Sequence, residues 1–501
     1  MTRNFAVRNF CNALAPALVF LLLTGVALAQ NSHPAAVKQS SLQSPPAKAT
    51  VSAVLLSDIH FEPFWDPAKV PQLAAAPVDR WKAILAAPPS SDQPQRFQAL
   101  QQSCPARGVD TPFALYDSAL KAMRKPTAGA AFVTVSGDLV SHSFDCKYNS
   151  FFPTHTPDSY RAFVKKTIDY VIDELYAAFP GVPVYVALGN NDSDCGDYRL
   201  DARGEFLSAT GKEVTRNFPA VERENAQASF ADGGYYSIAL PAPIENARLL
   251  VLNDIFMSKN YKSCAGKEDS TAADAQLKWL GQQLAEARVQ KEKVWVMGHI
   301  PPGVDLHATV TKMVDVCGGQ KPIMFLSSEK LADELTEFGD VTELAIFAHT
   351  HMDELHLLKS DKQSTVPESD VAIKLVSSIS PINGNHPSFT IAEIDPATAK
   401  LKDYRVYAAS NQSGIDATWP EEYDFTRSYH QAGVTAASLS KLLNEFSQDP
   451  SAKTQASQDY IRDFFVGAPS TLLNLVWPQY VCAISNDSAE AFKACVCSAA
   501  H

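Results

Sequence analysis

Residues 51–60 read VSAVLLSDIH, a short apolar run that ends in an aspartate and a histidine. A run of this length, bounded by polar residues, is typical of a buried strand. Five similar runs follow, and each also ends at a polar cluster: AFVTVSGD (131–138), VPVYVALGNND (182–192), RLLVLND (248–254), KVWVMGH (293–299) and LAIFAHTH (344–351). The repeated pattern predicts strands whose carboxyl ends carry functional side chains at one rim of a sheet.

Helix-like stretches separate several of these runs. Residues 157–179 and 271–290 are of this kind, and Ser270 is a candidate N-cap for the second. Alternating strands and helices predict an α/β sandwich. Three later runs follow one another closely and predict antiparallel strands that close the second layer: VAIKLVSSIS (371–380), SFTIAEID (388–395) and KDYRVYAA (402–409). Beyond about residue 409 we expect helices and no further strands.

The first 50 residues differ from the rest. Residues 1–29 combine Arg3 and Arg8, an apolar run and the small-residue site Ala27-Leu28-Ala29, which is the pattern of a cleaved signal peptide. An uncleaved membrane anchor is the alternative. The chain is therefore predicted to divide into four parts: a signal peptide (1–29), a flexible Ser- and Pro-rich linker (30–50), an α/β domain (51–408) and a helical, cysteine-containing C-terminal region (409–501). This division predicts a secreted or periplasmic protein with no membrane span after cleavage.

Cysteine content and net charge indicate the compartment in which the protein works and the kinds of partner that it can bind. Eight of the nine cysteines lie outside the predicted signal, and an even number in an exported chain predicts disulfides. Cys482 is expected to pair with Cys495 or Cys497, and the sequence leaves that choice open. With 43 Lys+Arg against 55 Asp+Glu, the formal net charge of −12 argues against a nucleic-acid partner.

The polar clusters contain the residue types that bind transition metals. Alone, each has an ordinary explanation as a capping or solvated group. Together they supply enough nitrogen and oxygen ligands for two divalent ions that share a carboxylate. The candidate metal ligands are Asp58, His60, Asp138, Asn190, His299, His349 and His351.

The order D-x-H, G-D, G-N-[HN]-[DE], G-H and [GA]-H-x-H resembles the calcineurin-like metallophosphoesterase superfamily over roughly residues 51–409. SDIHFEP (57–63) and GDLVSH (137–142) are similar to the acid sphingomyelinase-like phosphodiesterases and the endopolyphosphatases. The resemblance implies a four-layer α/β/β/α sandwich with a helical C-terminal appendage and a dinuclear site, with zinc favoured and Mn or Fe as alternatives. It places Asp58, His60, Asp138 and His351 at one ion, and the bridging Asp138 with Asn190, His299 and His349 at the other.

The sequence departs from the superfamily pattern at the expected proton donor. Asn191 stands where many members have a histidine, and an amide can orient phosphate but cannot act as the acid. We therefore expect His142 to supply the proton, because imidazole is protonated in mildly acidic surroundings. A surface loop histidine is the alternative. Ala348 replaces a common glycine, and only a slight backbone change is expected.

Substrate contacts are predicted on weaker patterns. Phe61 and Trp65 follow the first motif and are candidates for a substrate wall, with ordinary packing as the alternative. Asn385 and His386 lie in a loop that loosely matches a substrate-side loop of the resembled family. Three acids, Asp192, Asp194 and Asp197, either support the ligands or are solvated loop residues.

The sequence therefore predicts an exported dinuclear-metal phosphohydrolase, a phosphodiesterase of acid sphingomyelinase-like type. In this prediction a metal-activated hydroxide attacks phosphorus, His142 protonates the leaving oxygen, and the substrate is a small phosphorylated molecule or a phospholipid head group. The alternatives are a phosphomonoesterase or nucleotidase, an endopolyphosphatase, and a non-catalytic secreted metal-binding or interaction protein. The oligomeric state is not predicted.

Overall fold

Two six-stranded sheets form the centre of the described part of the chain. The computed structural model describes residues 50–105, 108–360, 369–467 and 470–498. The predicted signal peptide, and the predicted linker up to residue 49, lie outside the described residues. Within the described residues, no helix is both long and apolar enough to cross a membrane.

The first sheet has the strand order β12-β11-β10-β1-β2-β3. Its strands are β1 (Val51–Leu56), β2 (Val133–Ser136), β3 (Val184–Ala187), β10 (Ser388–Ile394), β11 (Leu401–Ala408) and β12 (Glu421–Asp424). Strands β1, β2 and β3 are parallel, whereas β10, β11 and β12 extend the sheet in antiparallel pairs. The three parallel strands therefore direct their carboxyl ends to one rim.

The second sheet has the order β4-β5-β6-β7-β9-β8. Its strands are β4 (Tyr236–Ala239), β5 (Ala247–Val251), β6 (Lys293–Met297), β7 (Thr342–Phe347), β8 (Glu354–Leu358) and β9 (Val371–Leu375). Strands β5, β6, β7 and β9 are parallel, and β4 and β8 are antiparallel edges.

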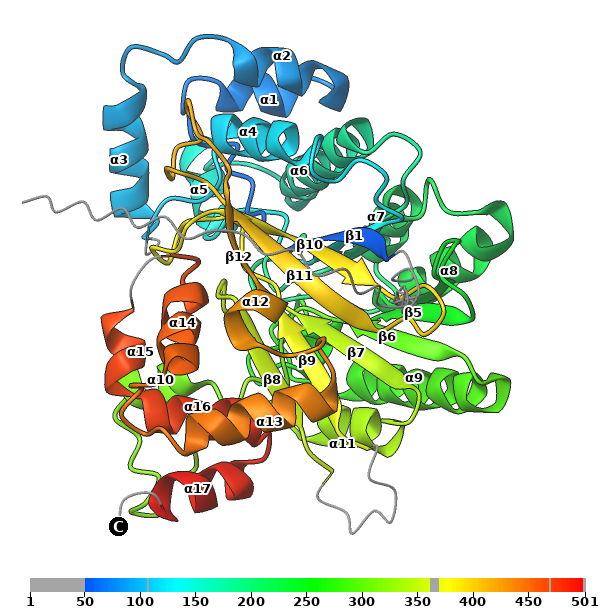
Figure 1. Cartoon of the computed structure of the whole chain (residues 1–501). Coiled ribbons are helices and arrows are strands. Elements are labelled where there is room, and N and C mark those ends of the chain that lie inside the picture. Colours follow the sequence, from blue (N-terminus) through cyan, green and yellow to red (C-terminus); the bar gives the residue numbers. More distant parts are fainter. Residues whose placement is uncertain (1–49, 106–107, 361–368, 468–469, 499–501) are drawn as a thin grey trace, which may run out of the picture. The chain divides into compact units, whose positions relative to one another are not determined.

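The two sheets face each other across a buried aromatic interface. The ring of Phe132, directly before β2, lies 6.0 Å from the ring of Trp295 in β6. The Tyr236 hydroxyl of β4 accepts a hydrogen bond from the backbone N–H of Val186 in β3 at 2.9 Å. Helices cover the outer faces, with α4 and α6 along one side and α9 and α11 along the other (Figure 1). The result is the four-layer α/β/β/α sandwich.

Helices connect the strands and cover the sheets. Those before the C-terminal region are α1 (Val70–Ala75), η1 (Val78–Arg80), α2 (Trp81–Ala86), α3 (Gln93–Ser103), α4 (Phe113–Met123), α5 (Phe144–Phe151), α6 (Pro157–Ala178), α7 (Glu205–Val214), α8 (Ala220–Gly233), η2 (Asp254–Met257), α9 (Thr271–Gln290), α10 (Leu306–Thr311) and α11 (Lys330–Glu337). The two predicted helices are confirmed as α6 and α9. Ser270 is the N-cap residue of α9, as predicted, but its hydroxyl donates to Asp274 and accepts no hydrogen bond from a backbone N–H of the helix.

The later strands differ from the prediction in two ways. Residues 371–375 form β9, which is parallel to β7, and β10 and β11 extend the first sheet instead of closing the second. Strands also continue past residue 409, because Glu421–Asp424 pairs with β11 as β12. An apolar run shows that a segment is a strand, but the choice of sheet depends on distant partners.

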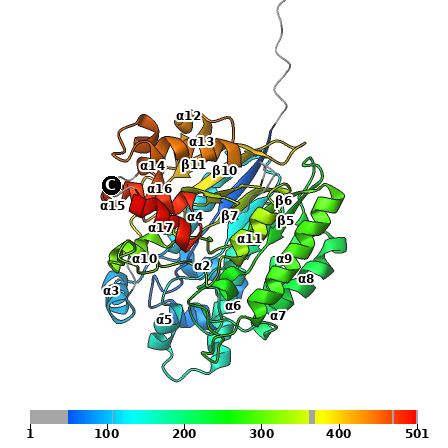
Figure 2. The same ribbon diagram turned by 90° about the horizontal axis from the view of Figure 1, so that it is seen from below.

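The C-terminal helices belong to the same compact unit as the sheets. They are α12 (Phe425–Tyr429), α13 (Ala436–Ser447), α14 (Gln455–Phe464), α15 (Thr471–Leu475), α16 (Trp477–Ser485) and α17 (Ala489–Ser498). Helix α12 contacts β11 and β12 of the first sheet, and α13 and α16 contact β8 of the second sheet. Figure 2 shows this group on the side away from α8 and α9.

Four disulfides pair all eight cysteines outside the predicted signal peptide. They are Cys104–Cys146, Cys195–Cys264, Cys317–Cys497 and Cys482–Cys495. The open choice for Cys482 is thus settled in favour of Cys495, while Cys497 ties α17 to the loop after α10.

Candidate metal centre

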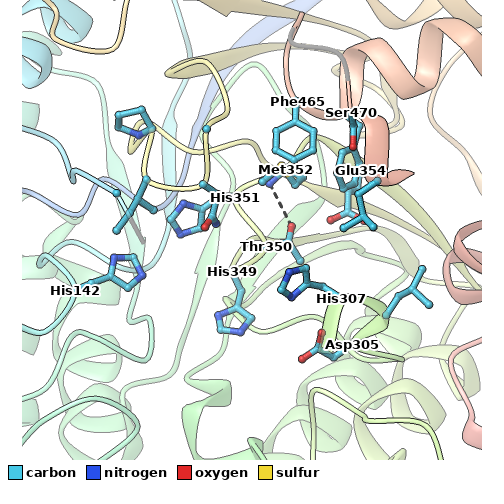
Figure 3. A pocket seen from close by; sticks show the side chains of 18 of the residues that line it. His142, Asp305, His307, His349, Thr350, His351, Met352, Glu354, Phe465 and Ser470 are labelled. Carbon is cyan, nitrogen blue, oxygen red and sulfur yellow. Dashed lines mark hydrogen bonds between the residues drawn. The ribbon is translucent and has the colours of Figure 1, made fainter. Parts of the chain in front are cut away.

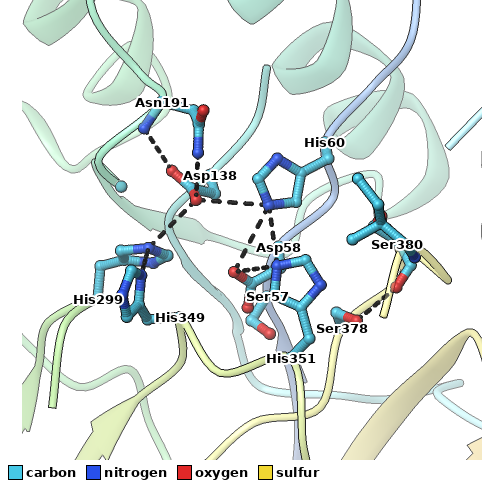
Figure 4. Close-up of polar contacts among 12 residues, drawn as sticks. Ser57, Asp58, His60, Asp138, Asn191, His299, His349, His351, Ser378 and Ser380 are labelled. Atoms are coloured by element: carbon cyan, nitrogen blue, oxygen red, sulfur yellow. Dashed lines mark hydrogen bonds and ion pairs between the residues drawn. The ribbon is translucent and has the colours of Figure 1, made fainter. Parts of the chain in front are cut away.

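The carboxyl ends of parallel strands from both sheets bring all seven candidate ligands to one rim, and Figure 4 labels all of them except Asn190. Two follow β1, one follows β2, one follows β3, one follows β6 and two follow β7: Asp58, His60, Asp138, Asn190, His299, His349 and His351. Five of the seven, all but Asn190 and His299, have φ between 43° and 72°. Non-glycine residues adopt this left-handed backbone at a cost of about 1–2 kcal/mol each. The fold therefore holds these side chains in a conformation that the local sequence alone does not favour.

The loops after β2 and β3 approach so closely that a glycine is required between them. A Cβ atom at Gly189 would lie 2.2 Å from the Asp138 carboxylate oxygen Oδ1. The glycine of the third motif therefore makes room for the central carboxylate.

One half of the site surrounds Asp58 and His60. The Nε2 atom of His60 lies 3.2 Å from Nε2 of His351 and 3.4 Å from Oδ2 of Asp138. The Asp58 Oδ1 atom lies 3.5 Å from Nε2 of His351 and 3.7 Å from Nε2 of His60. Two imidazoles and two carboxylates thus direct ligand atoms at one small volume.

The other half surrounds His299. Its Nε2 atom lies 3.1 Å from Oδ1 of Asn190, 3.2 Å from Nδ1 of His349 and 3.3 Å from Oδ2 of Asp138. The Tyr198 hydroxyl holds the far nitrogen of His349 at 3.2 Å. Asp138 Oδ2 faces both halves, which is the position that a bridging ligand requires.

The hydrogen bonds around the site leave the ligand atoms free to bind a metal. The Nδ1 atoms of His60 and His299 face backbone carbonyls of Val140 and Ser136 at 2.9 and 2.8 Å, so each Nδ1 carries a hydrogen and each Nε2 points into the site. Both carboxylate oxygens of Asp58 are buried and have no hydrogen-bond partner. Buried carboxylate oxygens normally have a hydrogen-bond partner or a metal ion beside them. Divalent ions bound at this site would be the missing partners of Asp58.

Proton affinities in the metal-free site are strongly shifted. Burial opposes protonation, but the neighbouring Asp138 carboxylate raises the pKa of His60 to about 9 and that of His299 to about 10. Burial lowers the pKa of both His349 and His351 to about 3, and neighbouring imidazoles add to the effect. The Asp138 carboxylate therefore stabilises positive charge on the neighbouring imidazoles of His60 and His299. A metal ion bound there would replace the protons on these imidazoles.

Three acids outside the predicted ligand set hold the site together. Asp192 Oδ1 accepts backbone hydrogen bonds from Leu139 and Val140 at 2.7 and 3.1 Å, and its Oδ2 accepts one from Gly189 at 2.9 Å. It is fully buried, and burial together with the charge on Asp138 raises its pKa to about 7. Of the two sequence alternatives for Asp192, the structure thus favours support over a solvated loop acid.

The other two acids orient single ligands. Asp197 Oδ1 accepts from Asn190 Nδ2 at 2.8 Å, which turns the Asn190 oxygen toward His299. Asp254, the first residue of η2 after β5, accepts hydrogen bonds from the backbone N–H groups of His299 and Ile300 at 2.8 and 3.0 Å. Asp194 instead pairs with Arg161 at 3.2 Å, outside this network.

His142 lies against the site, not on a free loop. Its ring stacks on His60 with centroids 4.0 Å apart, and its side chain is 32% exposed. Asp110 accepts from the backbone N–H of His142 at 2.8 Å and from its Nδ1 at 3.0 Å. Asp110 is fully buried beside a Lys147–Glu62 ion pair. This positioning carboxylate follows no predicted strand, and no sequence signal identified it.

Asn191 holds the carboxylate of Asp138. Its backbone N–H donates to Asp138 Oδ1 at 2.8 Å, and its Nδ2 donates to Oδ2 at 2.9 Å. Both donors are therefore directed at Asp138.

A cavity of about 1200 Å³ opens above the rim. His142, Asn190, Asn191, His349 and His351 line it on the α/β side. Figure 3 shows a second wall that carries Phe465 and Ser470 from the C-terminal region, and this wall also includes side chains of α15 and α16. No pattern in the sequence of residues 409–501 indicated a substrate-side role for that region.

The four residues predicted to contact substrate differ in whether they line the cavity. Trp65 lines the cavity. Phe61 does not, because it is fully buried against Tyr116 and Tyr170, so its predicted contact is corrected to core packing. Asn385 is also fully buried, and its amide donates to Ser378 and Ser380, which corrects its role to shaping the loop. The half-buried His386 is absent from the described residues that line the cavity.

A sandwich of two sheets with carboxylates and imidazoles at the shared rim defines a dimetal phosphoesterase. The chain matches the calcineurin-like phosphoesterase family over residues 52–353. It belongs to this family and is a metal-dependent phosphoric ester hydrolase.

Three relatives place the chain near the acid sphingomyelinase-like branch. Acid sphingomyelinase-like phosphodiesterase 3b of Mus musculus is 26% identical over 409 residues, which cover 79% of this chain and 79% of the relative. Cyclic GMP-AMP phosphodiesterase SMPDL3A of Homo sapiens is 25% identical and covers 68% of this chain and 70% of its own. Sphingomyelinase phosphodiesterase C of Dictyostelium discoideum is 22% identical, with coverage of 66% and 70%.

Proposed function

We propose that the protein is an exported phosphodiesterase that hydrolyses a small phosphodiester or a phospholipid head group at a dinuclear centre. The observation that carries the proposal is the position of Asp138 Oδ2, 3.4 and 3.3 Å from Nε2 of His60 and of His299. The seven candidate ligands fit two divalent ions, and their mixed imidazole, carboxylate and amide donors suit zinc, with Mn or Fe as alternatives. When bound, such ions polarise phosphoryl oxygens and lower the pKa of water.

The chain's own residues supply the remaining requirements of the reaction. A P–O bond to the water oxygen forms, the P–O bond to the leaving group breaks, and the leaving oxygen takes a proton. His142 is the proposed donor: Asp110 holds its Nδ1, so Nε2 remains available at the cavity surface. Asn191 fixes Asp138 through two hydrogen bonds and takes no part in proton transfer.

Cavity size and lining support a diester over the other phosphorylated substrates. The cavity of about 1200 Å³ extends from the ligands to the C-terminal wall, which leaves room for an organic group on each side of phosphorus. Among the described lining residues, none is a lysine or an arginine. A long polyphosphate chain would gain from such residues, so the endopolyphosphatase alternative is disfavoured.

Export is supported by the cysteines. All eight cysteines outside the predicted signal peptide are paired, and disulfides persist in oxidising compartments. Together with the signal-like residues 1–29, this supports a secreted or periplasmic location.

A hydrolysis screen tests the proposal. The full chain without residues 1–29 should hydrolyse bis-p-nitrophenyl phosphate with a higher kcat/KM than p-nitrophenyl phosphate, and Asp138→Asn should abolish both activities. A preference for the monoester would favour a phosphomonoesterase or nucleotidase. Folded, metal-loaded protein without turnover of any phosphoester would favour the non-catalytic alternative.

A further inference from the structure

The segment between β3 and α7 orients two candidate ligands through consecutive side chains. Asp197 Oδ1 accepts a hydrogen bond from Nδ2 of Asn190 at 2.8 Å. The hydroxyl of the next residue, Tyr198, lies 3.2 Å from Nε2 of His349. Both ligands contact Nε2 of His299, at 3.1 and 3.2 Å. One segment therefore determines how two ligands in the same half of the site are turned.

Backbone contacts hold Tyr198 in place from both sides. Its N–H donates to the carbonyl of Asn190 at 2.9 Å, and its carbonyl accepts from the N–H of Lys262 at 3.0 Å. Its φ of 56° lies in the left-handed region, which costs a non-glycine residue about 1–2 kcal/mol. The Cys195–Cys264 disulfide joins the same two segments, just before Tyr198 and just after Lys262. The surroundings of Tyr198 thus maintain a conformation that its own sequence does not favour.

The four candidate histidine ligands differ in what holds the nitrogen that faces away from the metal centre. A backbone carbonyl lies beside this nitrogen in His60 and in His299. In His351 it is buried and has no hydrogen-bond partner among the described residues. In His349 it is held by the side chain of Tyr198. Figure 4 shows His299 and His349 on one side of the site and His60 and His351 on the other, so dependence on a side chain is confined to one half.

We propose that Tyr198 is a positioning residue for the ion in the half of the site that surrounds His299, and that the Cys195–Cys264 disulfide keeps Tyr198 there. This role rests on the dinuclear centre of the proposed function and deepens it, because the two ions are then retained by different means. The Tyr198 hydroxyl accepts from Nε2–H of His349, which leaves Nδ1 of His349 without a hydrogen and available to a metal.

The disulfide links retention of this ion to the compartment of the protein. Cys195 lies in the segment that carries both Asp197 and Tyr198, so loss of the bond to Cys264 should loosen both ligand contacts together. Disulfides persist in oxidising compartments. The chain should therefore retain both ions only after export, when this disulfide has formed.

Zn²⁺ titration of the metal-depleted full chain, in competition with a chromogenic chelator, tests the role of Tyr198. The wild type should bind two ions per molecule. Tyr198→Phe keeps the ring and removes the hydroxyl, so one of the two binding steps should weaken by about 10- to 100-fold while the other is unchanged. A purely structural role would instead lower the stability of the metal-free chain and weaken both steps equally.

A matched tyrosine provides the control. The Tyr261 hydroxyl donates to the backbone carbonyl of Leu200 in the same segment at 3.0 Å, and among the described contacts it meets no candidate ligand. Tyr261→Phe should therefore leave both binding steps as in the wild type. Equal effects of Tyr198→Phe and Tyr261→Phe would overturn the positioning role.

A pair of cysteine variants tests the disulfide. Cys195→Ser with Cys264→Ser should weaken one step, and addition of Tyr198→Phe to this variant should leave the other step unchanged. Cys317→Ser with Cys497→Ser removes a disulfide that ties α17 to the loop after α10, so both steps should remain as in the wild type. Unchanged Zn²⁺ binding in the first pair would overturn the role of the disulfide.

Failure of the positioning role and failure of the proposed function give different results. If the wild type binds two ions and hydrolyses bis-p-nitrophenyl phosphate, but Tyr198→Phe binds both ions as tightly, only the positioning role is wrong. If the wild type binds two ions without turnover of any phosphoester, the proposed function is wrong, and the titrations still decide the role of Tyr198. A wild-type chain that binds no Zn²⁺ would overturn both.

Discussion

Replacing His142 or its partner Asp110 tests the proposed proton donor. His142→Ala removes the imidazole, whereas Asp110→Asn keeps the ring and changes what holds it. The Asp110 carboxylate accepts from the backbone N–H and Nδ1 of His142, and from the Ser380 hydroxyl at 3.0 Å. An asparagine offers one acceptor oxygen to these three donors, so at least one donor loses its partner.

The expected magnitudes follow from these contacts. General acid catalysis contributes about 10²- to 10⁴-fold, so His142→Ala should reduce turnover of an alkyl phosphodiester by that factor. A hydrogen bond to a charged group contributes about 1.5–3 kcal/mol, so Asp110→Asn should cost about 10- to 150-fold on the same substrate. On bis-p-nitrophenyl phosphate both losses should stay below about tenfold, because p-nitrophenolate departs without a proton.

The assay compares kcat on bis-p-nitrophenyl phosphate with kcat on an alkyl diester, either sphingomyelin or cyclic GMP-AMP. His430→Asn, at an exposed histidine after α12, is the matched control and should leave both values unchanged. Equal losses on the aryl and alkyl substrates in His142→Ala would refute the acid role. Unchanged turnover in Asp110→Asn would refute the positioning role.

Three further predictions concern the metal centre and the C-terminal region. The pKa values of His60 and His299 are about 9 and 10 without metal, so metal binding through their Nε2 atoms near neutral pH should release up to two protons. Metal affinity should therefore weaken as pH falls. Calorimetry in buffers of different ionisation enthalpy measures the proton release, and a heat of binding that does not depend on the buffer would contradict it. Asp197→Ala should weaken one of two metal-binding steps by about 10- to 100-fold, whereas Asp194→Ala should not, as judged by metal titration. Replacing Cys317 and Cys497 by serine removes a disulfide between residues 180 positions apart. The free energy of unfolding, measured by denaturant titration, should fall by about 2–5 kcal/mol. An unchanged unfolding midpoint would show that α17 docks without this disulfide.

The strand-end pattern was sufficient to locate the candidate ligands because chain direction and strand ends are local properties. The carboxyl ends of parallel strands share a rim, so the sequence alone predicts that residues as distant in the chain as Asp58 and His351 lie close together. Asp254 follows β5 in the same way and could have been found by the same signal.

Other features depend on contacts that no local pattern reports. Asp110 follows no buried strand, yet it meets His142 through the packing of a loop. Phe61 lies one residue after a candidate ligand, but its side chain points into the core. The second wall of the cavity comes from residues more than 100 positions beyond the last candidate ligand, and only the docking of α15 and α16 brings it to the rim.

Metal content measured alongside activity tests the central claim most directly. Elemental analysis of the purified chain should give about two divalent ions per molecule, with hydrolysis of bis-p-nitrophenyl phosphate lost on chelation and restored on adding the same metal. Asp138→Asn should lose both the ions and the activity. Hydrolysis that survives complete removal of metal, or full activity with Asp138 replaced, would contradict a dinuclear centre bridged by this carboxylate.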